Sequence, residues 1–144
     1  GMLLMSNIGG SSGVLYGGAY MAAAKAISTD TLDAAGACSM LTNMVNDMMT
    51  RGKSEPGYKT MIDSLYPAVQ AYRAALNEKK SDREALEAMR SAALSGAENT
   101  KNMEAVRGRA SYMLNKGVGH LDPGAVTMSY QLETLANFII NNVL

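Results

Sequence analysis

Apolar side chains recur every three or four positions along most of this chain, which is the spacing of one buried helix face. No segment alternates apolar and polar residues for long enough to predict a strand. The pattern predicts about five helices with short connections, which makes an antiparallel, all-α bundle. The clearest apolar stripes are Leu41, Met44, Val45 and Met48; Met61, Leu65, Val69, Tyr72 and Leu76; Leu86, Met89, Ala93 and Ala97; and Met128, Leu132, Leu135 and Phe138.

Polar residues predict where several of these helices begin. Asp30 suits the position that caps the second helix, with Asp33 three residues further on. Ser81 and Glu84 have the spacing of a capping box for a later helix. These helix starts therefore have sequence signals of their own, in addition to the apolar stripes.

Glycine-containing loops are expected at residues 7–13, 51–60 and 107–124. Each loop ends where a helix is predicted to begin, and the backbone N–H groups of helix N-termini bind anions. The first loop contains GGSSG, which is explained either by a flexible spacer or by a loop that binds a ligand. Glycines let a backbone approach phosphate oxygens closely, and Ser11 and Ser12 add hydroxyl donors.

The two later loops add groups that suit a nucleotide. Lys59 and Thr60 stand at the predicted start of the third helix, and the guanidinium of Arg109 suits a phosphate. Asp122 precedes Pro123 at the start of the last helix, where it suits either a sugar hydroxyl or the role of helix cap. The chain has neither a Walker A loop nor a dinucleotide fingerprint, because both follow a strand. The loops together therefore suggest a different kind of nucleotide site.

Several single residues have a simple structural explanation beside a functional one. His120 is the only histidine and suits a structural or a catalytic role. Cys38 lies among Ala and Met in a predicted helix and is expected to be buried and inert. One Cys and one His exclude a metal cluster built on these residue types. Asp63 follows Lys59 by four residues, which suits an ion pair on one helix face.

Composition narrows the function classes further. The chain has 144 residues, with 13 Lys and Arg balanced by 13 Asp and Glu, and its length predicts a single domain over residues 1–144. The balanced charge gives no sign of a nucleic-acid or membrane partner, and no apolar run reaches the roughly 18 residues that span a bilayer. A lone cysteine excludes an internal disulfide framework and fits the reducing cytoplasm. The 12 methionines fit a helical core or an adaptable partner surface.

Motifs in a fixed order then point to a family. "GGSSGVLYG", "RGKSEPGYKTMIDSLYPA", "GRASY" and "GHLDPGA" closely resemble the nucleotide-binding L domain of dihydroxyacetone (glycerone) kinases, over nearly the whole chain. The resemblance implies part of an eight-helix antiparallel barrel with the nucleotide at one end. It also implies ATP as the nucleotide in single-chain enzymes. In the phosphotransferase-linked systems it implies a bound ADP that a partner subunit rephosphorylates. The phosphoryl group then passes to dihydroxyacetone held on a histidine of a separate K subunit.

The resemblance also implies which residues contact the nucleotide, and it assigns no catalytic residue to this chain. Ser11 and Ser12 would contact the phosphates or the ribose, and Arg109 would contact the phosphates. The base and phosphate pocket would be lined by Gly52, Thr60 and Met61. The residues that would close on the sugar or base are Asp122, Pro123 and Gly124.

Departures from the family pattern affect the chemistry. The acidic GDxDHG loop that holds magnesium in the family lies before the glycine loop, whereas the first Asp here is Asp30. Tyr58 stands where the family has an Asp, and "MLNKG" at 113–117 replaces "LGERS". Phosphoryl transfer needs metal ions to neutralise phosphate charge. We therefore expect no magnesium ligands in this chain and no kinase activity from it alone.

The sequence thus predicts an L-type subunit of a dihydroxyacetone kinase that is incomplete at its N-terminus. The alternative is a truncated, non-catalytic homologue that acts as an interaction or nucleotide-binding protein. The missing helices are expected either to be lost or to come from another polypeptide. Their absence would expose an apolar interior, which predicts a homodimer.

Overall fold

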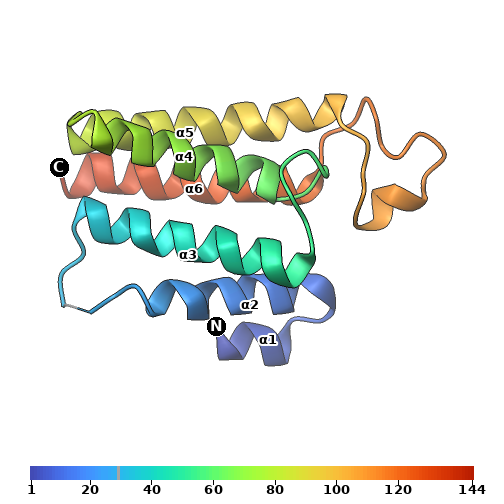
Figure 1. Cartoon of the computed structure of the whole chain (residues 1–144), viewed down its shortest axis with the longest axis horizontal. Coiled ribbons are helices and arrows are strands. Elements are labelled where there is room, and N and C mark those ends of the chain that lie inside the picture. The colour runs from blue at the N-terminus through green and yellow to red at the C-terminus, as the bar shows by residue number, and fades with distance from the viewer. Residues whose placement is uncertain (29) are drawn as a thin grey trace. The chain divides into compact units, whose positions relative to one another are not determined.

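The computed structural model describes residues 1–28 and 30–144, which form helices joined by loops (Figure 1). No strand occurs in these described residues, so the predicted all-α class is confirmed. The short first helix was not expected. The helices are α1 (Met2–Asn7), α2 (Gly10–Ala24), α3 (Ala34–Gly52), α4 (Ile62–Asn77), α5 (Asp82–Asn99) and α6 (Pro123–Asn142), with 3₁₀ turns η1 (Thr100–Asn102) and η2 (Arg109–Tyr112).

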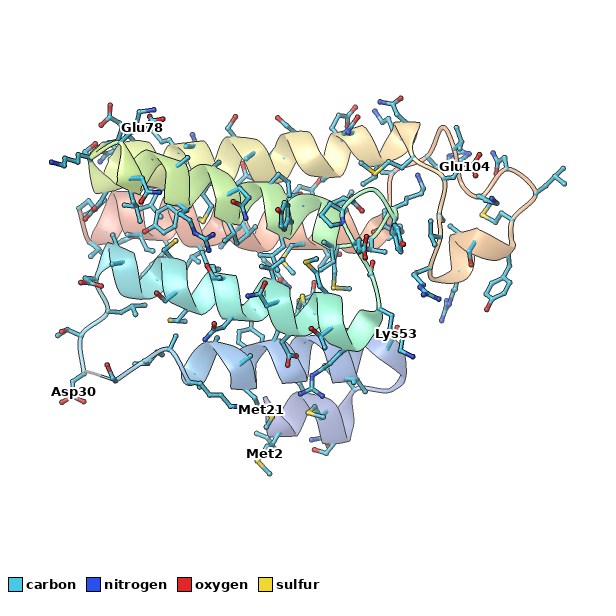
Figure 2. The ribbon with its side chains drawn as sticks, viewed as in Figure 1. Met2, Met21, Asp30, Lys53, Glu78 and Glu104 are labelled. Carbon is cyan, nitrogen blue, oxygen red and sulfur yellow. The ribbon has the colours of Figure 1, made fainter. Side chains whose placement is uncertain are left out.

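The chain divides into two compact units between Ser54 and Glu55, shortly after Lys53, which Figure 2 labels. The N-terminal unit, Gly1–Ser54, contains α1 to α3. The C-terminal unit, Glu55–Leu144, contains α4 to α6 with η1 and η2. A single domain over the whole chain stays a prediction.

Glycines allow α1 to lie directly against α2 in the N-terminal unit. A methyl group placed on Gly13 would overlap the carbonyl oxygen of Ile8, and one placed on Gly17 would overlap the side chain of Met5. The prediction of a loop at 7–13 is therefore wrong from Gly10 onward, where α2 begins. Glycine normally weakens a helix, but here its missing side chain makes room for a neighbouring backbone.

Helix α3 begins one position after Asp33, whose carboxylate accepts a 2.7 Å hydrogen bond from the backbone N–H of Gly36. The prediction that Asp30 is the cap is therefore wrong. A capping side chain must stand directly before the first helical residue, and Ala34 is that residue. The predicted apolar stripe and the burial of the cysteine are confirmed, since the buried residues of α3 are Cys38, Leu41, Met44, Val45 and Met48.

Helices α4, α5 and α6 pack against one another and form the core of the C-terminal unit (Figure 1). The predicted capping box is confirmed, because Ser81 and Glu84 exchange side-chain and backbone hydrogen bonds at the start of α5. Apolar positions with helical spacing supply the core: Leu65, Val69 and Tyr72 of α4; Leu86, Met89, Ala93 and Ala97 of α5; and Met128, Leu132, Ala136 and Ile140 of α6.

The apolar stripe predicted for α6 is wrong beyond Leu132. Leu135 is 42% exposed and Phe138 is 60% exposed, whereas Ala136 and Ile140 are buried. Steps of three residues move around a helix of 3.6 residues per turn and leave the core face, whereas steps of four stay closer to it. The small side chain of Ala136 concealed the correct register from the sequence pattern.

Helices α4 and α5 approach closely at Gly96. A methyl group on Gly96 would overlap the carbonyl oxygen of Asp63 and would lie 3.0 Å from Cγ of Pro67. Pro67 lies inside α4 and has no N–H to donate to that carbonyl. The contact holds the first turn of α4, where the candidate site lies. No helix in the described part of the chain is long and apolar enough to cross a membrane.

Candidate functional site

Two groups of the predicted nucleotide-contacting residues meet in the C-terminal unit. Thr60 and Met61 lie directly before α4, and Asp122 to Gly124 form the start of α6. A methyl group on Gly124 would lie 3.6 Å from the backbone N of Met61 and 3.7 Å from its Cβ. The N-termini of α4 and α6 therefore lie side by side, and each carries the positive partial charge of a helix N-terminus.

Asp122 caps α6, as one of its two predicted roles required. Its carboxylate accepts a 2.7 Å hydrogen bond from the N–H of Ala125, and its own N–H donates to Oγ1 of Thr100 at 2.9 Å. Burial raises the pKa of this carboxyl, while the Ala125 N–H and the charge of Lys59 act in the opposite direction. A role toward a sugar hydroxyl stays a prediction.

Asp63 shapes the loop that carries Thr60. Its carboxylate is buried and accepts hydrogen bonds from the N–H of Gly57 at 2.5 Å and from the N–H of Thr60 at 2.7 Å. Sequence reasoning missed this role. An acidic residue in the first turn of a helix was the available signal.

The predicted ion pair between Lys59 and Asp63 is wrong. The ammonium of Lys59 instead donates to the backbone carbonyls of Thr100 and His120, both at 2.5 Å. A four-residue spacing brings side chains together only within a helix, and α4 begins at Ile62, after Lys59. The side chain of His120 is exposed, and its predicted roles stay open.

Arg109 lies on η2, within the long connection from α5 to α6, and its side chain is exposed. Figure 2 labels Glu104 near the start of this connection. Backbone hydrogen bonds from Ala105 to Lys116 (2.9 Å) and from Val106 to Tyr58 (3.2 Å) tie its base to the rest of the unit. A contact between Arg109 and phosphates stays a prediction.

The remaining predicted contacts lie in the N-terminal unit. Ser11 and Ser12 are exposed in the first turn of α2, which no side chain caps. A methyl group on Gly9 or Gly10 would meet nothing within 4 Å, so the approach to this helix start is open. Gly52 is the last residue of α3, and a methyl group there would lie 3.4 Å from Cδ2 of Leu15.

The carboxylates near the candidate site do not suit a magnesium ion. Both oxygens of Asp63 accept backbone N–H groups, and Oδ2 of Asp122 accepts another. Outside the undescribed position 29, no three His, Cys, Asp or Glu side chains gather into a possible metal site.

Comparison with known proteins finds relatives over most of the chain. The sequence model of the DAK2 domain matches residues 1–137. The chain is similar to the ADP-binding subunit DhaL of the PEP-dependent dihydroxyacetone kinase of Escherichia coli (strain K12), with 39% identity over 94% of this chain and 65% of that protein. It is 38% identical to DhaL of the PEP-dependent dihydroxyacetone kinase 1 of Listeria innocua, over 87% of this chain and 58% of that protein.

A longer protein also matches. The triokinase/FMN cyclase of Homo sapiens is 37% identical over 93% of this chain, which covers 23% of that protein. The chain therefore spans less than two thirds of the length of each of these relatives.

Proposed function

We propose, because this chain belongs to the DAK2 domain family, that it binds ADP or ATP as the L-type part of a dihydroxyacetone kinase. Two relatives are named as ADP-binding subunits, which supports ADP as the ligand. The observation that carries the proposal is the meeting of the α4 and α6 N-termini at Met61 and Gly124. Two of the motifs through which the chain resembles nucleotide-binding L domains therefore meet at one place.

Charge divides the proposed contacts between the two ends of the nucleotide. The carboxylates of Asp63 and Asp122 lie at the paired helix ends and repel phosphates, so this place suits the sugar and the base. The guanidinium of Arg109 is exposed and suits the phosphates. The residues proposed to contact the sugar and the base at the paired helix ends are Thr60, Met61, Asp122, Pro123 and Gly124.

The N-terminal unit supplies the other proposed contacts. Ser11 and Ser12 offer exposed hydroxyl groups at an uncapped helix start, which suits phosphate oxygens or the ribose. Gly52 is proposed to line the pocket, as the family motif around it implies. These contacts rest on the motifs and on the local geometry of each helix end.

We propose further that the phosphoryl group passes to dihydroxyacetone held on a separate K subunit in the cytoplasm. Relatives named as PEP-dependent or PTS-dependent support a phosphotransferase-system subunit as the phosphoryl donor. The competing proposal is a non-catalytic protein that binds nucleotide or a partner. The engagement of Asp63 and Asp122 with backbone N–H groups favours this alternative for the isolated chain.

Calorimetric titration with ADP tests nucleotide binding. We expect a dissociation constant in the high micromolar range, roughly −5 kcal/mol, and weaker binding by Arg109→Ala. Arg107→Ala is the matched control, because this exposed arginine lies two residues away in the same connection. No saturable heat with millimolar ADP would contradict nucleotide binding. Equal losses in both variants would show that only general positive charge matters.

We also propose that the chain forms a homodimer through exposed apolar side chains. On α6, Tyr130 is 59% exposed and Phe138 is 60% exposed. Tyr and Phe side chains are enriched in protein–protein interfaces relative to the rest of the surface. Light scattering at micromolar concentration is expected to give twice the mass of one chain, and Phe138→Ser is expected to reduce it. A folded monomer would contradict the dimer.

A further inference from the structure

Lys59 is a buried lysine in the C-terminal unit. Only 2% of its surface is exposed, which is unusual for this residue type. Its ammonium donates to the carbonyl oxygens of Thr100 and His120, both at 2.5 Å. A charged group tolerates burial when hydrogen bonds replace its hydration. Lys59 therefore makes a polar connection inside the unit between the loop before α4 and two other segments.

The backbone around Lys59 is held in an uncommon conformation. Its φ of 59° lies in the left-handed region, which side chains other than glycine rarely adopt. The carboxylate of Asp63 accepts hydrogen bonds from Gly57 and Thr60, on either side of Lys59. Such a conformation persists where the surroundings determine it from several directions. These contacts direct the lysine side chain to one place.

Thr100 connects Lys59 to the start of α6. It lies at the C-terminal end of α5, where the helix dipole favours a cation. Its carbonyl accepts from Lys59, while its hydroxyl accepts from the N–H of Asp122 at 2.9 Å. Thr100 is fully buried. One residue thus joins the loop before α4 to the cap of α6.

Lys59 also supports the connection that carries Arg109. Gly117 has a φ of 75°, and a methyl group on it would lie 3.0 Å from Cε of Lys59. The same methyl group would lie 3.1 Å from Cβ of Ala110, the neighbour of Arg109. The aliphatic part of Lys59 therefore packs beneath this connection.

We propose that Lys59 is a positioning residue for the nucleotide site, on the premise that the proposed function is correct. Its ammonium braces Thr60 and Met61 against Asp122, and its aliphatic chain supports the segment of Arg109. It acts through these residues and makes no contact with the nucleotide itself. The class of ligand affected is a nucleoside diphosphate or triphosphate.

The experiment compares Lys59→Met with Lys79→Met in the full chain. Methionine keeps most of the aliphatic chain and removes the ammonium. Lys79 is the matched control, because it has a φ of 57° and is exposed in the turn between α4 and α5. Calorimetric titration with ADP gives both the dissociation constant and the number of sites.

We expect Lys59→Met to bind ADP at least about tenfold more weakly, as loss of a charged hydrogen bond implies, with an unchanged number of sites. Lys79→Met is expected to match the wild-type chain. A dissociation constant within twofold of wild type would overturn the proposal. A reduced number of sites with an unchanged dissociation constant would also overturn it, because that result reports only partial unfolding.

Amine acetylation followed by peptide mass spectrometry tests, without any nucleotide, whether the Lys59 ammonium is buried and hydrogen-bonded to Thr100 and His120. Lys59 of the wild-type chain is expected to react at least about tenfold more slowly than Lys79, because it is buried and hydrogen-bonded. Equal reactivity of Lys59 and Lys79 would contradict these hydrogen bonds and overturn the proposal. If Lys59 is protected and the wild-type chain does not bind ADP, the proposed function and the positioning role both fail, whereas the polar connection itself stands.

Discussion

Asp122 places a carboxylate in a partly buried cap, and this predicts a pH-dependent stability. Burial raises the pKa above the ordinary value of 3.8, so the folded chain binds this proton more tightly than the unfolded chain does. The stability that the protonated Asp122 carboxyl contributes is fully present below pH 3.8 and is lost as the pH rises through the raised pKa. Asp122→Asn keeps a capping oxygen without the charge. We expect it to match wild type near pH 3 and to be more stable near pH 7.

Thermal unfolding followed by circular dichroism measures this difference at each pH. Asp122→Ala is the control, because it removes the cap itself. It should cost about 0.5–2 kcal/mol near pH 3 and less near pH 7, where wild type has lost the stability that the protonated carboxyl contributes. A stability gap between the asparagine variant and wild type that does not change with pH would contradict the assignment of a raised pKa to Asp122.

Polar side chains show which contacts of single residues can be predicted from the sequence and which cannot. The capping roles of Ser81 and Asp122 could be predicted, because a cap is a local pattern of a few residues. The contacts of Lys59 could not, since its partners Thr100 and His120 are 41 and 61 residues away. Local spacing suggested an ion pair that the start of α4 at Ile62 prevents.

At the scale of elements, Gly96 controls how closely α5 approaches α4. Gly96→Ala raises helix propensity by up to about 1 kcal/mol, but its methyl group would overlap the carbonyl oxygen of Asp63. We expect a net loss of about 1–3 kcal/mol in the free energy of unfolding, measured by urea denaturation. Ser95→Ala, an exposed neighbour on the same helix, is expected to be neutral or slightly stabilising. Stabilisation by both variants would mean that the helices are not in close contact at this glycine.

The register of α6 gives a second test between matched positions. Leu132 is 4% exposed and Leu135 is 42% exposed on the same helix. Leu132→Ala is expected to cost about 2–5 kcal/mol of stability, as buried leucines do, and Leu135→Ala less than about 1 kcal/mol. Chemical denaturation of both variants measures the difference. Equal costs would mean that Leu135 lies on the core face of α6, as the sequence pattern predicted.

Apolar stripes followed from the sequence more reliably than helix boundaries did. The stripe of α3 was correctly predicted, because large apolar residues mark its core face, and the stripe of α5 was correctly predicted from Leu86 and Met89. The start of α2 was missed, because Gly13 indicates flexibility in a sequence, whereas in the fold it allows close contact with the carbonyl oxygens of Leu4 and Ile8. The distinction depends on a neighbouring element, and local propensity contains no information about that neighbour.

At the scale of the whole molecule, the predicted contact residues belong to two compact units. Motif order predicted which residues belong together, and the C-terminal unit does bring Met61 and Gly124 into contact. Ser11, Ser12 and Gly52 belong to the N-terminal unit. Their contribution to nucleotide binding stays a prediction, which calorimetric titration of variants from each unit with ADP measures.

The chain alone is expected to show no kinase turnover with ATP and dihydroxyacetone. Phosphoryl transfer requires metal ions that neutralise the phosphates. The carboxylates beside the site, Asp63 and Asp122, already accept backbone hydrogen bonds. Using either to hold magnesium would break hydrogen bonds to a charged group, each of which is worth about 1.5–3 kcal/mol. A spectrophotometric assay of ADP release, with Arg109→Ala as the background control, measures turnover. Magnesium-dependent activity above that control would show that these carboxylates exchange their backbone partners for the metal, and that the chain is a working kinase subunit.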